Sequence, residues 1–198
     1  MSETREKLID TAIDLFLTRG YGAVGTAELC RQAGVNKGTA YHFFPSKSDL
    51  LIAAIEKYTE KFRAAFERIA ASDRAPEDKV RELFKVPTSA NKKCKSEHGF
   101  SQGCLIANMS LELGSVEPEV RLAAQRALKS IQAAIEPIVR ELVSAGRIPD
   151  IDTRRGAEII LGLIQGGIVL AKGNNDPSKI VQMGRGAIGA LRELEPTS

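Results

Sequence analysis

The sequence has no strong excess of charge of either sign. Its 28 Lys and Arg residues are nearly balanced by 25 Asp and Glu residues, which leaves a formal net charge of +3. Gross charge therefore makes no case for nucleic-acid binding, and any basic surface must come from how side chains are arranged. Residues 1–50 are fully balanced, with six basic residues (Arg5, Lys7, Arg19, Arg31, Lys37, Lys47) and six acidic ones (Glu3, Glu6, Asp10, Asp14, Glu28, Asp49).

Cysteine and histidine are scarce. The three cysteines, Cys30, Cys94 and Cys104, are an odd number and fit no disulfide framework. The two histidines are His42 and His98, and the chain has no phosphate-binding glycine loop, no strand–turn–helix nucleophile and no H-E-x-x-H motif. The sequence therefore argues against an enzyme, and we expect no cofactor.

Long apolar runs are also absent. The N-terminal segment MSETREKLID contains no long apolar stretch, so we expect no signal peptide. The longest apolar run, Ile159–Ala171, is interrupted by Gln165 and is shorter than a bilayer requires. An apolar fraction of 43% with 27% charged residues is ordinary for a soluble protein. We expect a cytoplasmic protein with no membrane partner.

Helical periodicity dominates the whole chain, and no segment alternates like a strand. The sequence therefore predicts an all-α fold of about nine helices. The expected helices are Glu3–Thr18, Ala27–Ala33, Asn36–Phe43, a long helix from Ser46 to Ala71, Pro76–Phe84, Gly103–Leu113, Pro118–Ala145, Asp152–Lys172 and Pro177–Leu194.

Several local features mark the ends of these helices. Thr26 is predicted to cap the second helix by accepting a backbone N–H, and Ser46 with Asp49 resembles a capping box. The polar and basic stretch 87–102 is predicted to be a loop. Pro137 is predicted to kink the helix that contains it.

The segment TAELCRQAGVNKGTAYHFF fits a helix-turn-helix. Two short helices that cross steeply need a small residue where they touch, a glycine at the turn, and apolar residues that hold the pair together. Cys30 fills the small position and Gly34 the turn. The apolar residues that hold the pair are expected to be Leu29, Val35, Ala40 and Phe43.

The residues GVNKGTAYHFFPSKSDLL, after TAELCRQA, closely resemble the N-terminal signature of the tetracycline-repressor (TetR) family. The resemblance covers roughly residues 5–55, and beyond it only helix number and length match. Cys30 is one departure, since the family usually has alanine there. The resemblance implies a helix-turn-helix DNA-binding domain at residues 1–48 and a helical effector-binding and dimerisation domain at residues 49–198. It thus implies a transcriptional repressor whose partner is double-stranded operator DNA.

Carried over by position, the resemblance places seven residues at the DNA surface: Thr26, Lys37, Gly38, Thr39, Tyr41, His42 and Lys47. Lys37 and Thr39 lie early on the recognition helix, the part that enters the major groove in this architecture. Gly38 permits close backbone approach. The hydroxyls, imidazole and remaining ammonium suit phosphate oxygens, which set register without reading sequence.

A homodimer that pairs the last two helices is expected, because two recognition helices would then read a palindrome. The glycines of these helices (Gly162, Gly166, Gly167, Gly173, Gly184, Gly186 and Gly189) would let backbones approach closely. Their apolar residues (Leu161, Ile164, Ile168, Ile180, Ala187 and Leu191) would supply the buried area. The alternative is that these helices complete the core of one chain, although interior glycines cost about 1 kcal/mol each and so favour a packing role.

Repressors of this family usually release DNA when a small molecule enters the helical domain. Candidate pocket residues, each of which could instead be core, are Phe62, Phe66, Leu83, Phe100, Cys104, Leu105, Asn108, Met109, Ile135 and Ile164.

Cys104 could act as a redox or electrophile sensor. It lies near a helix N-terminus, where the helix dipole favours the thiolate. Cys104, Asn108 and Glu112 form one polar stripe, and GCLIANMSLELG resembles the corresponding segment of electrophile- and oxidant-responsive family members. Lys172 would activate the thiol further if it folds close to it. Cys104 could equally be a small buried hydrophobe with no chemistry.

The composition and motifs leave room for a metal site, an activator and an adaptor. Cys94, His98 and Cys104 could form an incomplete metal site, although zinc needs a fourth ligand and a mobile loop fits the composition better, so we expect no metal. The chain could activate transcription, because that depends on operator position. It could also be a DNA-free adaptor, which would not bind a palindrome even at low salt.

Overall fold

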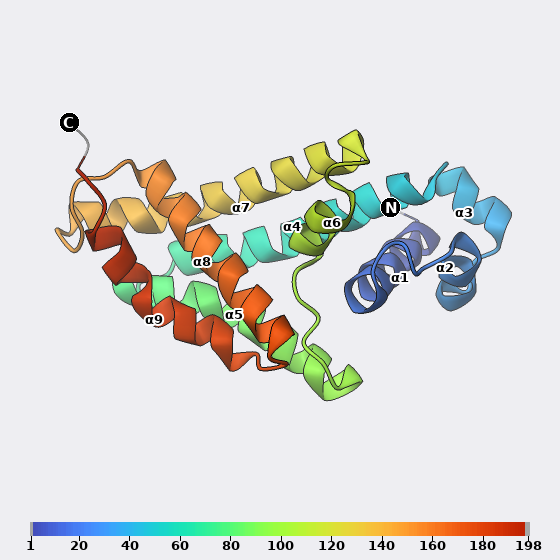
Figure 1. Cartoon of the computed structure of the whole chain (residues 1–198). Coiled ribbons are helices and arrows are strands. Elements are labelled where there is room, and N and C mark those ends of the chain that lie inside the picture. The colour runs from blue at the N-terminus through green and yellow to red at the C-terminus, as the bar shows by residue number, and fades with distance from the viewer. Residues whose placement is uncertain (1, 197–198) are drawn as a thin grey trace. The chain divides into compact units, whose positions relative to one another are not determined.

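The computed structural model describes residues 2–196, and within them the chain forms nine helices and no strand, which confirms the all-α prediction (Figure 1). Eight helices begin and end within two residues of their predicted bounds. The helices are α1 (Glu3–Arg19), α2 (Thr26–Ala33), α3 (Lys37–Phe43), α4 (Lys47–Ala70), α5 (Pro76–His98), α6 (Leu105–Leu113), α7 (Pro118–Ser144), α8 (Thr153–Gly173) and α9 (Ser178–Arg192).

The fifth helix is where the sequence prediction is wrong. Instead of giving way to a loop at residue 87, α5 continues through Pro87 to His98. Pro87 cannot donate the ladder hydrogen bond to the preceding turn. Two side chains bond to carbonyls on either side of it: Thr88 Oγ1 donates to the Phe84 carbonyl (2.7 Å) and Asn91 Nδ2 to the Pro87 carbonyl (3.0 Å). The buried residues recur at helical spacing and are Lys79, Val80, Leu83, Phe84, Pro87, Thr88, Asn91 and Cys94.

The predicted caps have mixed outcomes. Ser46 and Asp49 form the predicted capping box, with Ser46 N–H donating to Asp49 Oδ2 (2.9 Å) and Asp49 N–H to Ser46 Oγ (3.0 Å). The prediction for Thr26 is wrong, because Thr26 is the first helical residue and Gly25 is the N-cap. Asn36 is a cap that was not predicted from the sequence: its Oδ1 accepts the Thr39 N–H (2.8 Å) at the start of α3.

The chain divides into two compact units. Unit 1 contains the residues up to Lys61 together with Cys104–Leu128, and in it α1 packs against α2, α3 and α6. Unit 2 contains Phe62–Gly103 and the residues from Lys129 onward, and in it α9 lies along both α5 and α8 (Figure 1). The predicted division of roles between residues 1–48 and 49–198 stays a prediction.

The packing of α8 and α9 shows that the apolar residues predicted to form the dimer surface are buried within one chain. The six apolar residues expected to face a partner are at most 8% exposed within one chain, so they are core residues. Two of the glycines are also packed internally: a Cβ on Gly167 would lie 3.0 Å from Ile180 Cα, and one on Gly184 would lie 2.7 Å from the Phe84 ring. Gly167 and Gly184 therefore serve close approach between helices of the same chain.

The sequence analysis expected no apolar segment long enough to cross a bilayer. By length and composition alone, α8 is long and apolar enough. Its best 18-residue window has a mean hydropathy of 1.4, which passes that test among the described residues. About 44% of the window is buried in the protein. A core helix packed along α9 passes the same test, so the composition alone is weak support for a membrane span.

Candidate DNA interface and effector region

Buried residues of α2 and α3 explain how so short a helix as α3 is held. Leu29, Cys30 and Ala40 are all at most 7% exposed and line one small pocket together. Gly34 adopts a left-handed conformation (φ +67°, ψ +31°), and the Val35 N–H then donates to the Cys30 carbonyl (2.9 Å). The predicted glycine turn and small contact residue are therefore both present.

Two of the four predicted holding residues, Val35 and Phe43, are only half-buried in the structure. Phe43 is only half-buried, whereas its neighbour Phe44 is 7% exposed. The Arg5 guanidinium lies over the Phe44 ring, 5.3 Å from its centroid, which ties α1 to the end of α3. Phe44, the residue just past the end of α3, is the buried aromatic residue instead.

The first turn of α3 presents the side chains that the resemblance assigns to DNA. Lys37 and Gly38 are exposed and Thr39 is half-buried, with Asn36 capping the same turn. Tyr41 is 48% exposed and His42 is also exposed, its ring 5.4 Å from that of Phe43. Solvent therefore reaches the side chains that would have to contact a duplex.

Lys47 and Thr26 lie at two neighbouring helix starts and are both half-buried. The Lys47 Nζ donates to the Tyr21 and Val24 carbonyls (2.9 Å each) and lies 3.7 Å from the Tyr21 ring centroid. Burial lowers the pKa of Lys47, while the negative charge of Glu112 acts in the opposite direction. Two of the three ammonium protons are thus committed to the protein, and the predicted DNA contact of Lys47 stays a prediction.

Cys104 is the N-cap of α6 and is only 4% exposed. The Tyr58 hydroxyl is hydrogen-bonded to the Cys104 side chain and to the backbone of Leu105. Burial, reinforced by Cys104, raises the pKa of Tyr58 well above its usual value, and the bond to Leu105 opposes this shift. A reagent that modifies Cys104 must therefore first reach a buried sulfur.

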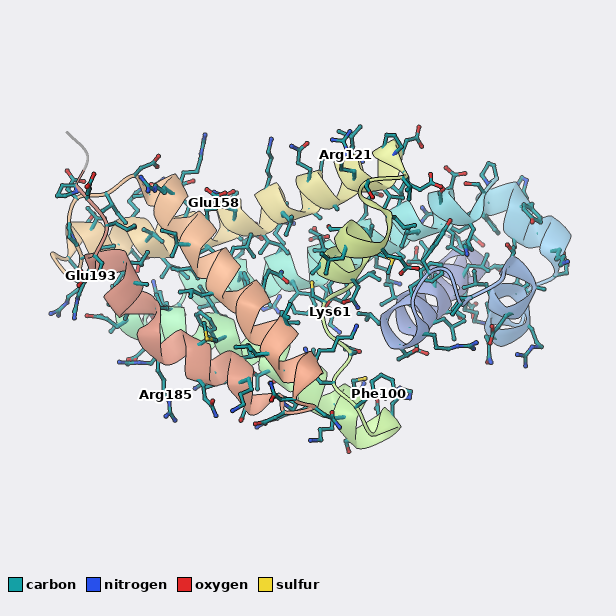
Figure 2. The ribbon with its side chains drawn as sticks, viewed as in Figure 1. Lys61, Phe100, Arg121, Glu158, Arg185 and Glu193 are labelled. Carbon is teal, nitrogen blue, oxygen red and sulfur yellow. The ribbon has the colours of Figure 1, made fainter. Side chains whose placement is uncertain are left out.

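The structure distributes the predicted effector residues over both units. Cys104, Leu105, Asn108 and Met109 belong to unit 1 at α6, while Phe62, Phe66, Phe100, Ile135 and Ile164 belong to unit 2. Most of them are buried, Asn108 is half-buried, and Phe100 is 38% exposed on the segment that follows α5 (Figure 2). Lys172 is exposed near the end of α8 in unit 2. Their roles stay predictions.

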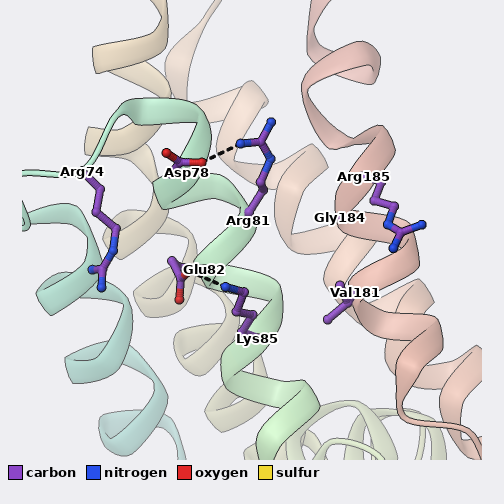
Figure 3. A pocket seen from close by; sticks show the side chains of 8 residues that line it. All are labelled: Arg74, Asp78, Arg81, Glu82, Lys85, Val181, Gly184 and Arg185. Atoms are coloured by element: carbon purple, nitrogen blue, oxygen red, sulfur yellow. Dashed lines mark hydrogen bonds and ion pairs between the residues drawn. The ribbon is translucent and has the colours of Figure 1, made fainter.

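A surface pocket of about 490 Å³ in unit 2 lies between α5 and α9, and none of the predicted effector residues lines it. Two ion pairs cross its α5 wall, Arg81–Asp78 (2.5 Å) and Lys85–Glu82 (2.6 Å) (Figure 3). The full lining is Arg74, Asp78, Arg81, Glu82, Lys85, Val181, Gly184 and Arg185. The pocket was not predicted, because charges three residues apart on a helix resemble an ordinary solvated face.

Metal binding finds no support in the part of the chain that the structure describes. No group of three or more His, Cys, Asp or Glu side chains among residues 2–196 is arranged to hold a metal ion. Cys94 is buried on α5, and His98 ends the same helix with its ring 6.1 Å from that of Phe100. The expectation of a mobile loop around Cys94 and His98 is wrong, since both belong to α5.

Comparison with known protein families gives two matches that together cover most of the chain. Residues 8–54 match the family described as bacterial regulatory proteins of the tetR family. Residues 76–186 match the tetracyclin repressor-like C-terminal domain.

Among individual proteins, the chain is similar to the transcriptional regulator AcuR of Cereibacter sphaeroides, with 31% identity over 74% of this chain and 66% of AcuR. It is also similar to the HTH-type transcriptional repressor NemR of Escherichia coli K12, with 30% identity over 67% of this chain and 65% of NemR. Each aligned segment spans just under two thirds of the relative's length.

Solved structures show the same fold. A regulatory protein TetR from Rhodobacter sphaeroides superposes with a TM-score of 0.82 at 27% identity, covering 95% of this chain and 98% of that one. The reduced form of Escherichia coli NemR superposes with a TM-score of 0.78 at 21% identity, covering 99% and 100%. The first family match runs from α1 into α4, and the second runs from α5 into α9.

Proposed function

Because this chain belongs to the TetR family of bacterial transcriptional regulators, we propose that it is a ligand- or redox-responsive repressor that binds a palindromic operator as a homodimer. The observation that carries the proposal is the exposed first turn of α3, held on a buried contact with α2. A binding event or a thiol modification in the helical domain would release the DNA.

The division of labour at the DNA follows from chemistry and exposure. Lys37 and Thr39 occupy the first turn of α3 and would reach base edges, where an ammonium can donate to guanine acceptors. Gly38 would let the backbone approach the groove. Tyr41, His42, Thr26 and the remaining Lys47 proton would donate to phosphate oxygens and set the register.

The DNA-binding experiment measures fluorescence anisotropy of a duplex taken from the region upstream of the chain's own gene. We expect the wild-type chain to bind it, and Lys37→Ala to weaken binding by about 10-fold. Lys61→Ala, which removes an exposed lysine from α4, is the matched control and should bind like wild type. Equal affinities for all three proteins would remove Lys37 from the interface, and no binding at low salt would favour a DNA-free adaptor.

Support for the homodimer comes from a stripe on α8 that no residue among 2–196 of the same chain covers. A Cβ added at Gly162, Gly166 or Gly173 would meet no atom within 4 Å, and Val169 is 58% exposed. These four residues have the spacing i, i+4, i+7 and i+11, which places them on one helix face. Gly186 and Gly189 on α9 are open in the same way. Another copy of the chain would cover such a face closely.

Gly166→Arg tests this interface without strain inside the protomer, because the new side chain starts in open space. We expect sedimentation of the variant to show a monomer and its operator affinity to fall by at least about 100-fold, since one recognition helix reads only half a site. Gln125→Arg adds the same charge to an exposed position of α7 and should stay dimeric. A dimeric Gly166→Arg variant would exclude this face.

The redox branch of the proposal rests on Cys104 as the N-cap of α6 and on the likeness to NemR. N-ethylmaleimide or hypochlorite should release operator DNA from the wild-type chain and from Cys30→Ser and Cys94→Ser. Cys104→Ser should keep its DNA under the same treatment. Unchanged release in Cys104→Ser would leave only the small-molecule branch, whose candidate pocket residues remain those of α6 and of the core of unit 2.

A further inference from the structure

The turn between α1 and α2, residues 20–25, is held from two sides by opposite charges. On one side, the Glu112 carboxylate of α6 accepts two backbone N–H groups: Oε1 from Gly22 at 2.7 Å and Oε2 from Tyr21 at 3.1 Å. On the other side, Lys47 Nζ donates to the Tyr21 and Val24 carbonyls. The anion therefore holds the amide groups of the turn and the cation holds its carbonyls, which matches the polarity of the peptide groups.

Glycines make this close approach of the carboxylate feasible. Gly20 ends α1 at φ +84°, a conformation that L side chains rarely adopt. A Cβ at Gly22 would lie 3.3 Å from Glu112 Oε1, and one at Gly20 would lie 3.4 Å from Oε2. The turn is therefore shaped so that its backbone can receive a carboxylate.

Lys47 and Glu112 connect the α1–α2 turn to two further helices, α4 and α6. Lys47 is the first residue of α4 and follows directly on the turn after α3, while Glu112 lies one residue before the end of α6. At its other end, α6 is preceded by its N-cap Cys104, which is hydrogen-bonded to the Tyr58 hydroxyl. All of these residues belong to unit 1. One short helix thus links the Cys104 region to the turn that also anchors the start of α4.

We propose that Glu112 is a positioning residue for DNA binding: it couples α6 to the DNA-binding helices α1–α3 by fixing the α1–α2 turn. The coupling rests on the proposed function, whereas the clamp formed by Glu112, Tyr21 and Gly22 stands on geometry alone. When α6 shifts, the turn and the start of α4 shift with it, and the orientation of α3 changes. Coupling is reciprocal, so DNA bound at α3 must also alter α6.

Amide exchange of the full-length chain, measured by NMR, tests the clamp without DNA. In Glu112→Gln the side chain loses its charge and one acceptor, so exchange at Tyr21 and Gly22 should accelerate by about 10-fold. Glu119→Gln removes an equal charge from an exposed position at the start of α7 and should leave both amides unchanged. Unchanged exchange in Glu112→Gln would overturn the clamp.

A second measurement tests the coupling itself, with a duplex enriched by the wild-type chain from a random-sequence library. DNA should slow exchange in Leu105–Leu113 by at least about 3-fold in wild type and Glu119→Gln, and this response should vanish in Glu112→Gln. A purely structural contact would instead leave the response intact. An equal response in all three proteins, or none in DNA-bound wild type, overturns the coupling. If wild type enriches no duplex, the proposed function fails and the coupling with it, while the clamp is still judged by the first measurement.

Discussion

At the scale of single residues, Asn91 shows how one side chain can organise a segment. It is 1% exposed, and its Oδ1 accepts from Ser101 Oγ (2.7 Å) and from the Gly103 N–H (3.0 Å), while Nδ2 donates to the Pro87 carbonyl. A buried amide with every group satisfied holds the chain that runs from the end of α5 towards α6.

Asn91→Leu should lower the free energy of unfolding by about 2–4 kcal/mol, because it leaves the Ser101 hydroxyl and the Gly103 N–H buried without that partner. Urea unfolding followed by circular dichroism measures the loss. Ser89→Ala changes an exposed residue of the same helix and should cost under about 0.5 kcal/mol. If Asn91→Leu unfolds at the same urea concentration as wild type, water has replaced the lost contacts.

Tyr58 provides a pH dependence. Its pKa is raised in the folded chain, chiefly by burial, so folding favours the neutral phenol. The resulting stability is present below the unfolded pKa of about 10 and is lost as the pH rises towards the folded value. Wild type should therefore lose more stability than Tyr58→Phe between about pH 8 and pH 10.5. If the urea midpoints of wild type and Tyr58→Phe fall equally as the pH rises, the loss of stability at alkaline pH comes from other groups.

At the scale of elements, the glycines of α8 and α9 fall into two classes that the sequence does not separate. Gly167 and Gly184 are pressed against neighbours in the same chain, whereas Gly166 and Gly186 face open space. Both classes look identical in sequence, because each is a glycine within a helical apolar pattern. Only the positions of the neighbouring helices distinguish internal packing from a free face.

This distinction predicts opposite signs for one substitution. Gly184→Ala should destabilise the chain by about 1 kcal/mol, since overpacking against Phe84 outweighs the gain in helix propensity. In the Gly166→Arg background, where the proposed dimer face is already disrupted, Gly186→Ala should stabilise the protomer by up to about 1 kcal/mol, because its Cβ meets no atom within 4 Å. Thermal unfolding of both variants in parallel gives the comparison, and equal shifts would contradict the packing at Phe84.

The sequence was sufficient wherever local rules decide the outcome. Eight helices, the Ser46–Asp49 cap and the Gly34 turn follow from periodicity, capping chemistry and backbone freedom. It was insufficient where tertiary packing outweighs a local penalty, as for Pro87, which is buried inside α5, a helix that packs against α8 and α9. Glu112 was noted only as part of a polar stripe, because its partners Tyr21 and Gly22 lie about 90 residues away in the chain.

At the scale of the whole molecule, the positive and negative charges of the chain almost cancel. A net charge of +3 attracts a duplex only weakly, so the proposed repressor would depend on two copies of α3 that bind one operator together. In such a dimer the half-sites lie about 34–36 Å apart, or at a multiple of that distance.

Inserting about five base pairs at the centre of the operator turns one half-site to the opposite side of the duplex. We expect this insertion to lower the affinity by at least about 100-fold. An insertion of one full turn returns both half-sites to the same side of the duplex, and the affinity should recover only as far as the dimer can flex to span the wider spacing. Anisotropy titrations of the three duplexes provide the measurement. Equal binding to all of them would mean that each copy binds its half-site independently.

The way the backbone passes between the two units limits how this protein can be dissected. The chain crosses from one to the other within α4 after Lys61, between Gly103 and Cys104, and within α7 after Leu128. No single cut in the polypeptide can therefore separate them. A truncated fragment ending at Lys61 would lack Leu105, Ile106 and Met109, which are fully buried in the intact chain, and would leave a hydrophobic surface in water. A smaller version of unit 1 would require residues 104–128 to be grafted back onto the fragment.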